Sequence, residues 1–156
     1  MYLSPVVFLS EQTAQAAPIV DLRAPISFQP TTTATSRGTP TVNIAAPNSN
    51  GISLNQYQTS GVCPEGLALN NSTVPGTPLL GGALGANSNL SGRPASTIIN
   101  RVTSNNAAVM NRPLETFGVP ATVIVSAPGD VSVNGIAPTN IPGLTSSSAA
   151  LLRTVA

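Results

Sequence analysis

The chain contains no histidine, no tryptophan and one cysteine, and only 7% of its 156 residues are charged. Without histidine and with a single thiol, a multi-Cys/His zinc site, a disulfide within the chain and a histidine-based catalytic triad are all excluded. The formal net charge of +1 creates no field that would attract nucleic acid or an anionic membrane surface. The composition therefore argues against electrostatic recognition and removes the commonest catalytic groups.

The single cysteine, Cys63, lies in the turn-like stretch 61–66, which reads GVCPEG. A reactive cysteine needs a neighbouring histidine, lysine or arginine that stabilises its thiolate, and none is close in the sequence. We therefore interpret Cys63 as a small, partly buried residue rather than a reactive thiol.

The apolar residues that are present are mainly aliphatic, since hydrophobic residues make up 41% of the chain and aromatic residues only 3%. The 15 prolines and 13 glycines, together with many Ser, Thr and Asn residues, supply frequent turns and disfavour long helices. This composition predicts short β-strands that are joined by corners and enclose a thin core of Val, Ile, Leu and Ala.

The clearest strand signal is the stretch 121–136, which reads ATVIVSAPGDVSVNGI. Two runs rich in β-branched residues, 122–125 and 131–133, are separated by a turn over 127–130 and closed by the Asn-Gly pair 134–135. This pattern predicts strand, turn, strand, turn. The chain is organised around this stretch.

Alternation predicts which faces of these two strands are buried. In the second run Val131 and Val133 point to one side, as a strand with one buried face requires. In the first run Val123 and Val125 share a face, and Ile124 makes the opposite face apolar as well. We therefore expect the first run to be the best-buried strand of the chain.

Similar patterns predict further strands before this stretch. In one of them Ile52 and Leu54 form a narrow apolar stripe, and Ser53 and Asn55 lie on the opposite face. The other predicted strands have their apolar residues at Val42 and Ile44, at Leu67 and Leu69, at Ile98 and Val102, and within 114–117. The Gly-rich region 74–92 has no Lys-Ser/Thr after its glycines, so we interpret it as a surface excursion and not as a phosphate-binding loop.

Short strands at intervals of about ten residues, joined by Asn, Gly and Pro corners, permit two architectures. One is a sandwich or barrel, and the other is a β-solenoid. Two-residue hairpin signals are scarce, and the asparagines predicted to end strands at positions 55, 70 and 134 suit coils whose polar side chains stack at matching corners. These residues favour the solenoid without excluding the sandwich or barrel.

An ordered series of short motifs then resembles a known family. The motifs are 14–20 (AQAAPIV), 42–57 (VNIAAPNSNGISLNQY), 69–72 (LNNS), 80–82 (LGG), 87–90 (NSNL), 94–102 (PASTIINRV), 114–115 (LE), 123–125 (VIV) and 133–135 (VNG). In this order the chain resembles the N-terminal secretion domain, or haemagglutination activity domain, of two-partner-secretion exoproteins. That group contains filamentous haemagglutinin and the contact-dependent growth-inhibition proteins, and the similarity extends roughly from Ala14 to Ser148.

The resemblance implies an all-β fold, a right-handed parallel β-helix with extra-helical β elements. It further implies a secretion address and folding nucleus for an adhesin or toxin precursor, with no catalysis and no cofactor. The implied partner is an outer-membrane β-barrel transporter with periplasmic recognition domains. The implied route is export through the periplasm to the cell surface or the medium. A host or neighbouring cell surface would be contacted by a downstream region, and nucleic acid is not an expected partner.

The resemblance also implies two recognition turns. The family motif Asn-Pro-Asn-Leu is altered here to Asn87, Ser88, Asn89 and Leu90. The family motif Asn-Pro-Asn-Gly-Ile corresponds to the stretch that contains Pro128, Gly129, Asp130 and Val131, followed by Asn134 and Gly135. The first motif loses the proline that would fix φ, and the second loses both asparagine side chains, although Gly129 or Asp130 could still adopt positive φ.

These considerations divide the chain into four segments. Residues 1–17 are predicted to be the remnant of a signal peptide or a disordered N-terminus, because an apolar run precedes small residues but no positive region opens it. Residues 18–40 are predicted to be an extended, exposed and poorly ordered Pro/Thr-rich segment. Residues 41–148 are predicted to be a β-helix that is incomplete at its C-terminal end, and residues 149–156 to be a tail.

Other functions stay open at this stage. The chain could be a stand-alone adhesive or structural surface protein, or a non-functional truncated remnant of a longer one. An enzyme is the least favoured reading, because the acidic residues Asp21, Glu65, Glu115 and Asp130 form no local constellation in the sequence. Catalysis would require carboxylates distant in the sequence to converge in space, as in a glycosidase.

Overall fold

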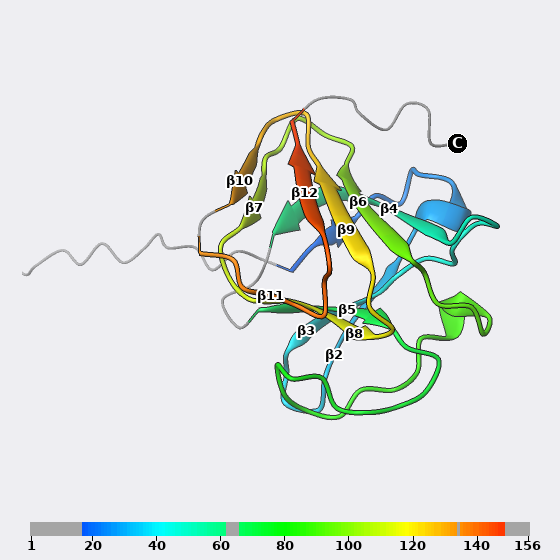
Figure 1. Cartoon of the computed structure of the whole chain (residues 1–156). Helices are drawn as coiled ribbons and strands as arrows, with labels where there is room; N and C mark the ends of the chain where they lie inside the picture. The colour runs from blue at the N-terminus through cyan, green and yellow to red at the C-terminus, as the bar shows by residue number, and fades with distance from the viewer. Residues whose placement is uncertain (1–16, 62–65, 134, 149–156) are drawn as a thin grey trace, which may run out of the picture.

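The computed structural model describes residues 17–61, 66–133 and 135–148, which form strands and two single-turn 3-10 helices. The chain winds in successive coils around one axis, and each coil lies alongside the one before it (Figure 1). The predicted all-β, right-handed parallel β-helix with extra-helical β elements is confirmed. The expected signal remnant, Cys63, Asn134 and the tail lie outside the described residues. Within the described ranges, no helix has the length and apolarity that a membrane span needs.

The coils present three sides, each formed by parallel strands. The β4 side consists of β4 (Ile52–Gly61), β6 (Thr97–Val102), β9 (Thr122–Ser126) and β12 (Leu144–Ser147). The β5 side consists of β3 (Pro40–Asn43), β5 (Leu67–Asn71), β8 (Leu114–Gly118) and β11 (Pro138–Thr139). The β7 side consists of the end of β4, β7 (Ala108–Met110) and β10 (Val131–Val133).

The core forms because equivalent residues of successive coils stack in register. On the β4 side Ile98 pairs with Val123, and Val123 pairs with Leu144. With the inward residues of the other two sides they form one aliphatic core, whose buried members include Val42, Ile44, Leu67, Leu69, Val102, Leu114 and Val125. Burial of each such side chain contributes about 1.5–3 kcal/mol, and only stacked coils can cover these narrow stripes.

The apolar stripe predicted for Ile52 and Leu54 is present, but it does not belong to the main core. Leu54 stacks on Ile99 in a second, outer cluster that Phe28 covers. The polar face points inward instead, and both Ser53 and Asn55 are fully buried. A polar inner face is tolerated because both side chains form hydrogen bonds with the backbone of the corner before β4. The Ser53 hydroxyl donates to the carbonyl of Ala45 (2.7 Å), and the Ala45 N–H donates to Asn55 Oδ1 (2.8 Å).

Strand β9 forms as predicted, but it is not the best-buried strand. That strand is β5, in which all five residues are buried. Its inner face contributes to the core, and its outer face is covered by the Gly-rich excursion, whose Gly85 carbonyl accepts a hydrogen bond from the Asn70 side chain (3.0 Å). The excursion comes close to the segment before β3 at Gly82, which has φ of 90° and where a Cβ would overlap Thr35.

Strand β10 also forms as predicted, but it buries less than expected. Val131 packs against the core, whereas Val133 is 45% exposed. The reason is its position, because β10 is the terminal strand of its sheet within the described residues and has β7 on one side only. A strand with one neighbour leaves part of its apolar surface in solvent.

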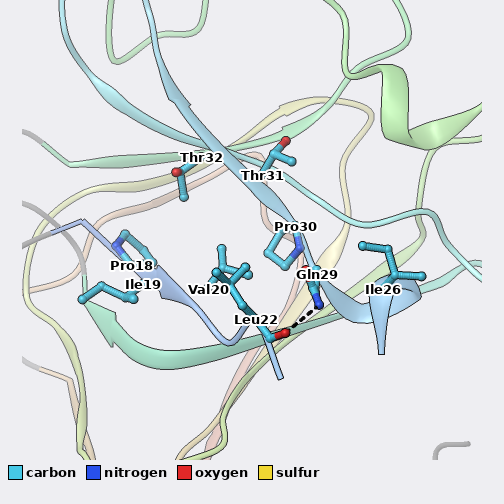
Figure 2. Close-up of a pocket in the computed structure, with 9 residues that line it drawn as sticks. All are labelled: Pro18, Ile19, Val20, Leu22, Ile26, Gln29, Pro30, Thr31 and Thr32. Carbon is cyan, nitrogen blue, oxygen red and sulfur yellow. Dashed lines mark hydrogen bonds between the residues drawn. The ribbon is translucent and has the colours of Figure 1, made fainter. Parts of the chain in front are cut away.

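The segment before β3, predicted to be extended, exposed and poorly ordered, is extended and exposed at β2 but forms more regular structure than its composition indicates. Strand β1 (Ile19–Val20) pairs antiparallel with β4, and β2 (Thr31–Ala34) pairs antiparallel with β3. Between them lies the 3-10 helix η1 (Ile26–Phe28), and residues of these elements line a pocket (Figure 2). Together these elements cap the first coil, as terminal units of solenoids do. The propensity of single residues does not reveal such pairing, because β2 gains its order from the edge of β3.

Candidate functional site

The first predicted recognition turn, Asn87 to Leu90, is a tightly held structure. It forms the 3-10 helix η2 (Ser88–Leu90), and Asn87 caps this helix because its Oδ1 accepts the N–H of Asn89 (2.9 Å). Ser91 ends the helix with φ of 50°. Leu90 is buried in the core and Ser88 is exposed. The turn is therefore anchored at both ends and presents its middle to solvent.

Two asparagine side chains attach this turn to neighbouring coils. Asn87 Nδ2 donates to the carbonyls of Ile44 and Asn70, both at 2.9 Å. Asn89 Nδ2 donates to the carbonyl of Asn43 (3.2 Å). These amides donate to carbonyls at or near the ends of β3 and β5, and so help to satisfy the backbone where the chain turns. The turn thus keeps the local hydrogen bonds of a rigid corner without the proline of the family motif.

The second predicted turn survives, as its glycine and aspartate allow. Pro128 and Gly129 occupy the turn, and Asp130 adopts positive φ, 151°. The Asp130 carboxylate accepts the N–H of Val131 (2.8 Å), which replaces a local bond that an asparagine would make. Gly129 lies so close to the carbonyl of Asn105 that a Cβ would overlap it. The two corners can therefore approach each other only because Gly129 has no side chain.

The two turns are not brought together into one site. The Asn87 turn lies over the corner that joins β3 to β4, whereas the Pro128 turn joins β9 to β10. The second turn packs on the corner between β6 and β7, where Ala108 N–H donates to the carbonyl of Asp130 (2.9 Å). Gly135 has φ of 76° and is exposed, and Asn134 lies outside the described residues.

Sequence reasoning missed the residues that fix the excursion. Asn71, at the end of β5, is fully buried and bonds to Ala95 and Val119. Glu115 on β8 is buried, and its carboxylate accepts the N–H groups of Leu79 and Leu80, each at 2.9 Å. In the sequence, the signal for Asn71 was the pair Asn70 and Asn71 at the end of an alternating strand. Asparagine amides can both donate to and accept from the backbone at a corner.

The acidic side chains bond to their surroundings and not to one another. Asp21 is buried, and it accepts the hydroxyl of Thr103 (2.6 Å) and the N–H and Nε of Arg23. The Thr103 hydroxyl, followed by the Arg23 backbone N–H, lowers the pKa of Asp21 below its ordinary value. Glu115 holds the excursion, and Asp130 holds its own turn. Glu65 lies outside the described residues, and elsewhere no three His, Cys, Asp or Glu residues gather to hold a metal ion.

This geometry defines a class of protein: a capped parallel β-helix with rigid turns at its corners. Its described acidic side chains accept hydrogen bonds that hold the fold together. The crystal structure of a filamentous hemagglutinin secretion domain has the same fold, with a TM-score of 0.75 and 34% sequence identity over 84% of this chain and 42% of that chain. A family model described as the TPS secretion domain matches residues 17–153. The chain belongs to this family, the secretion domains of two-partner-secretion exoproteins.

Relatives with known names agree with this assignment. A hemolysin of Serratia marcescens is 44% identical over 95 residues, which are 61% of this chain and 6% of that protein. The filamentous hemagglutinin of Bordetella pertussis is 41% identical over 106 residues, 68% of this chain and 3% of that protein. A tRNA nuclease CdiA of Yersinia mollaretii is 43% identical over 109 residues, 69% of this chain and 4% of that protein.

The chain thus corresponds to a small part of each of these relatives. The shared part is a secretion-targeting module of an exported protein, and its family is a targeting family rather than a catalytic one. Two-partner secretion implies a partner transporter for the exported protein.

Proposed function

We propose that this β-helix is the secretion address and folding nucleus of a filamentous-hemagglutinin-like adhesin or toxin precursor. Its partner is an outer-membrane β-barrel transporter, whose periplasmic domains bind the folded coils at the Asn87 turn and the Pro128 turn. The protein passes through the periplasm and continues to the cell surface or the medium. Family membership over residues 17–153 supports the secretion role.

One observation carries the assignment of a recognition role to the Asn87 turn. The side-chain amide of Asn87 is buried and fully engaged, while Ser88 and Arg93 beside it are exposed. The backbone is therefore held in one conformation before any partner arrives, and a partner does not have to order it. Such preorganisation lowers the entropic cost of binding.

Co-purification with the periplasmic domains of the cognate transporter tests the proposal. The full chain is expected to be retained by these domains. Ser88→Trp and Pro128→Trp place a bulky side chain on each exposed turn and are each expected to reduce retention at least tenfold. Arg112→Trp, at an exposed position in the corner between β7 and β8, a different corner from either turn, serves as the matched control and is expected to bind like the parent chain.

Circular dichroism separates a binding defect from a folding defect, because all three variants should keep the β spectrum of the parent. Retention of both turn variants at the level of the Arg112 variant would remove the turns from the interface. No retention of the parent chain, under conditions in which a related secretion domain binds its own transporter, would refute transporter recognition altogether.

A further inference from the structure

The corner between β3 and β4 contains an Asn-Gly pair, Asn50 and Gly51. Asn-Gly is the dipeptide most prone to spontaneous deamidation, because glycine has no Cβ to hinder attack by its backbone nitrogen on the asparagine amide. Asn50 is exposed, so water reaches the reacting atoms. The pair therefore has the chemistry of a modification site, in a segment that belongs to neither recognition turn.

The nucleophile of this reaction is the backbone nitrogen of Gly51. It gives up its proton and attacks Cγ of Asn50, and the amide group leaves with that proton as ammonia. The product is a five-membered succinimide ring, which water opens at either of its carbonyls to give aspartate or isoaspartate at position 50. In isoaspartate the chain continues through the side-chain carbonyl, so the backbone gains a methylene group before Gly51.

The folded corner withholds this nucleophile. The Gly51 N–H donates to the carbonyl of Asn48 (3.0 Å), so it is engaged in the turn. Asn48 Oδ1 accepts the N–H groups of Asn50 (2.9 Å) and Ile52 (3.0 Å), which holds the peptide units before and after the reacting one. Because ring closure removes the proton of the Gly51 N–H, the turn must open before the reaction can proceed.

The carbonyl of Gly51 is held by the next coil, which contains β6. It accepts the N–H groups of Ser96 (2.8 Å) and Thr97 (3.1 Å) and the hydroxyl of Ser96 (3.2 Å). Gly51 has φ of 79°, and a Cβ at this position would lie 2.6 Å from Ser96 Oγ. Directly after it, Ile52 begins the pairing of β4 with β6 opposite Thr97. Gly51 is thus the point at which the next coil docks.

We propose that Asn50 is a deamidation site that is open in the unfolded chain and closed in the folded one, and that its isoaspartate form prevents this docking. An added methylene before Gly51 displaces its carbonyl from the donors of Ser96 and shifts Ile52 out of register with Thr97. Stacked coils depend on register, because each narrow apolar stripe is covered only by its neighbours. The aspartate form retains the normal backbone and an exposed side chain, so it leaves docking intact.

Incubation of folded and urea-unfolded chains tests the protection. All samples carry Asn134→Gln, which removes the other Asn-Gly pair of the sequence. Peptide mapping by mass spectrometry is expected to show that position 50 deamidates about tenfold or more faster in urea, since opening of the folded corner limits the reaction. Asn48→Ala removes the side-chain acceptor and should raise the rate in the folded protein severalfold. Ser49→Ala, in the same turn, leaves these bonds intact and should not.

A brief protease pulse tests the block to docking. Deamidated chains are transferred to the urea concentration at which half of the parent chains are folded, and protease digests the unfolded molecules. Among the survivors, isoaspartate at position 50 is expected to be depleted about fivefold or more relative to aspartate, because the backbone bonds to Gly51 are lost. Electron-transfer fragmentation distinguishes the two products. The Asn50→Asp chain, which has the charge but the normal backbone, is the matched control and should survive like the parent.

Several outcomes overturn the inference. Equal rates in the folded and unfolded chain, or no deamidation at position 50 in urea, would mean that the corner contains no protected site. An unchanged rate in folded Asn48→Ala would remove the Asn48 side chain from the protection. Survival of isoaspartate chains at the parent level would refute the block, and equal loss of the Asn50→Asp chain would assign it to charge. Neither measurement involves the transporter, so a failure leaves the proposed function untouched.

Discussion

Asn71 and Ala95 are joined by a pair of reciprocal hydrogen bonds. Asn71 Nδ2 donates to the Ala95 carbonyl (2.8 Å), and the Ala95 N–H donates to Asn71 Oδ1 (2.7 Å). The side chain of Asn71 thus substitutes for a neighbouring strand at the point where the excursion returns to the coil. The same amide donates to the carbonyl of Val119 (2.8 Å), so one residue connects two successive coils.

Asn71→Ala is expected to be strongly destabilising. The substitution leaves the buried N–H and carbonyl of Ala95 without their partner, and each such group costs about 1–3 kcal/mol. It also removes the partly buried bond to the Val119 carbonyl. Urea unfolding followed by circular dichroism should show a free energy of unfolding lowered by about 3 kcal/mol or more. Asn106→Ala, which removes an exposed side chain that donates to Gln58, is the control and should change stability little. Equal effects of the two substitutions would contradict the role of Asn71.

Restoring the family proline in the first turn, by Ser88→Pro, is expected to be stabilising. Ser88 is the first residue of η2, a position that suits proline. Asn87 has φ of −85° and ψ of 104°, which is compatible with a following proline. The gain should be about 0.4–1 kcal/mol, because the unfolded chain loses freedom. Thermal unfolding measures it, with Ser91→Pro at the positive-φ cap as the destabilising counterpart.

Thr116→Val is expected to stabilise the fold. Thr116 is fully buried on β8, and its hydroxyl is the one buried side-chain oxygen that lacks a hydrogen-bond partner in the described part of the chain. Its replacement by a methyl group removes the cost of an unpaired hydroxyl, about 1 kcal/mol. Thr41→Val is the matched variant, because the Thr41 hydroxyl is equally buried but donates to the Thr39 carbonyl, and it should be destabilising. A loss of stability in both variants would contradict this account.

Stability at acid pH should depend on Asp21. Its pKa is lowered in the folded state, first by the Thr103 hydroxyl, so its bonds contribute stability above the ordinary value of 3.8. That contribution is lost as the pH falls through the folded-state pKa. In urea titrations from about pH 6 to about pH 2, Asp21→Asn should weaken this pH dependence and be less stable at the upper end. Parallel titration curves for the two proteins would contradict the assignment.

Glu115→Gln should loosen the excursion selectively. The carboxylate accepts two backbone N–H groups, and a glutamine side chain has one acceptor oxygen and turns a donor toward the other N–H. Hydrogen exchange at Leu79 and Leu80 should accelerate at least tenfold, a change of about 1.4 kcal/mol in local opening. Exchange at Val123, in β9 on the β4 side, should change much less. Uniform acceleration across the chain would indicate a global effect instead.

Much of the architecture could be predicted because it rests on alternating aliphatic residues. Val123 and Val125, and likewise Ile98 and Val102, point into the core as their spacing indicates. The series of family motifs then distinguished a solenoid from a sandwich, which periodicity alone did not. Local residue pattern is reliable where a strand is flanked by similar strands and its inner face is apolar.

The failures have a common physical cause, which is coverage by distant parts of the chain. Ser53 and Asn55 are buried because the corner before β4 satisfies them, and β5 is buried on both faces because the excursion covers it. The cap formed by β1 and β2 was missed for the same reason. The roles of the Asn87 and Pro128 turns in recognition stay predictions, since their geometry fixes a surface but not what binds it.

The antiparallel cap also gives the solenoid a polarity. Because β2 runs opposite to β3, no further parallel rung can continue the coil stack beyond it, whereas β11 and β12 are the terminal strands at the other end of their sheets in the described chain. Coils can therefore accumulate in one direction only. A polypeptide that emerges N-terminus first would fold its capped coil before later coils appear. Each new coil would then pair with a coil that is already folded, and the coils would fold in the order in which they emerge.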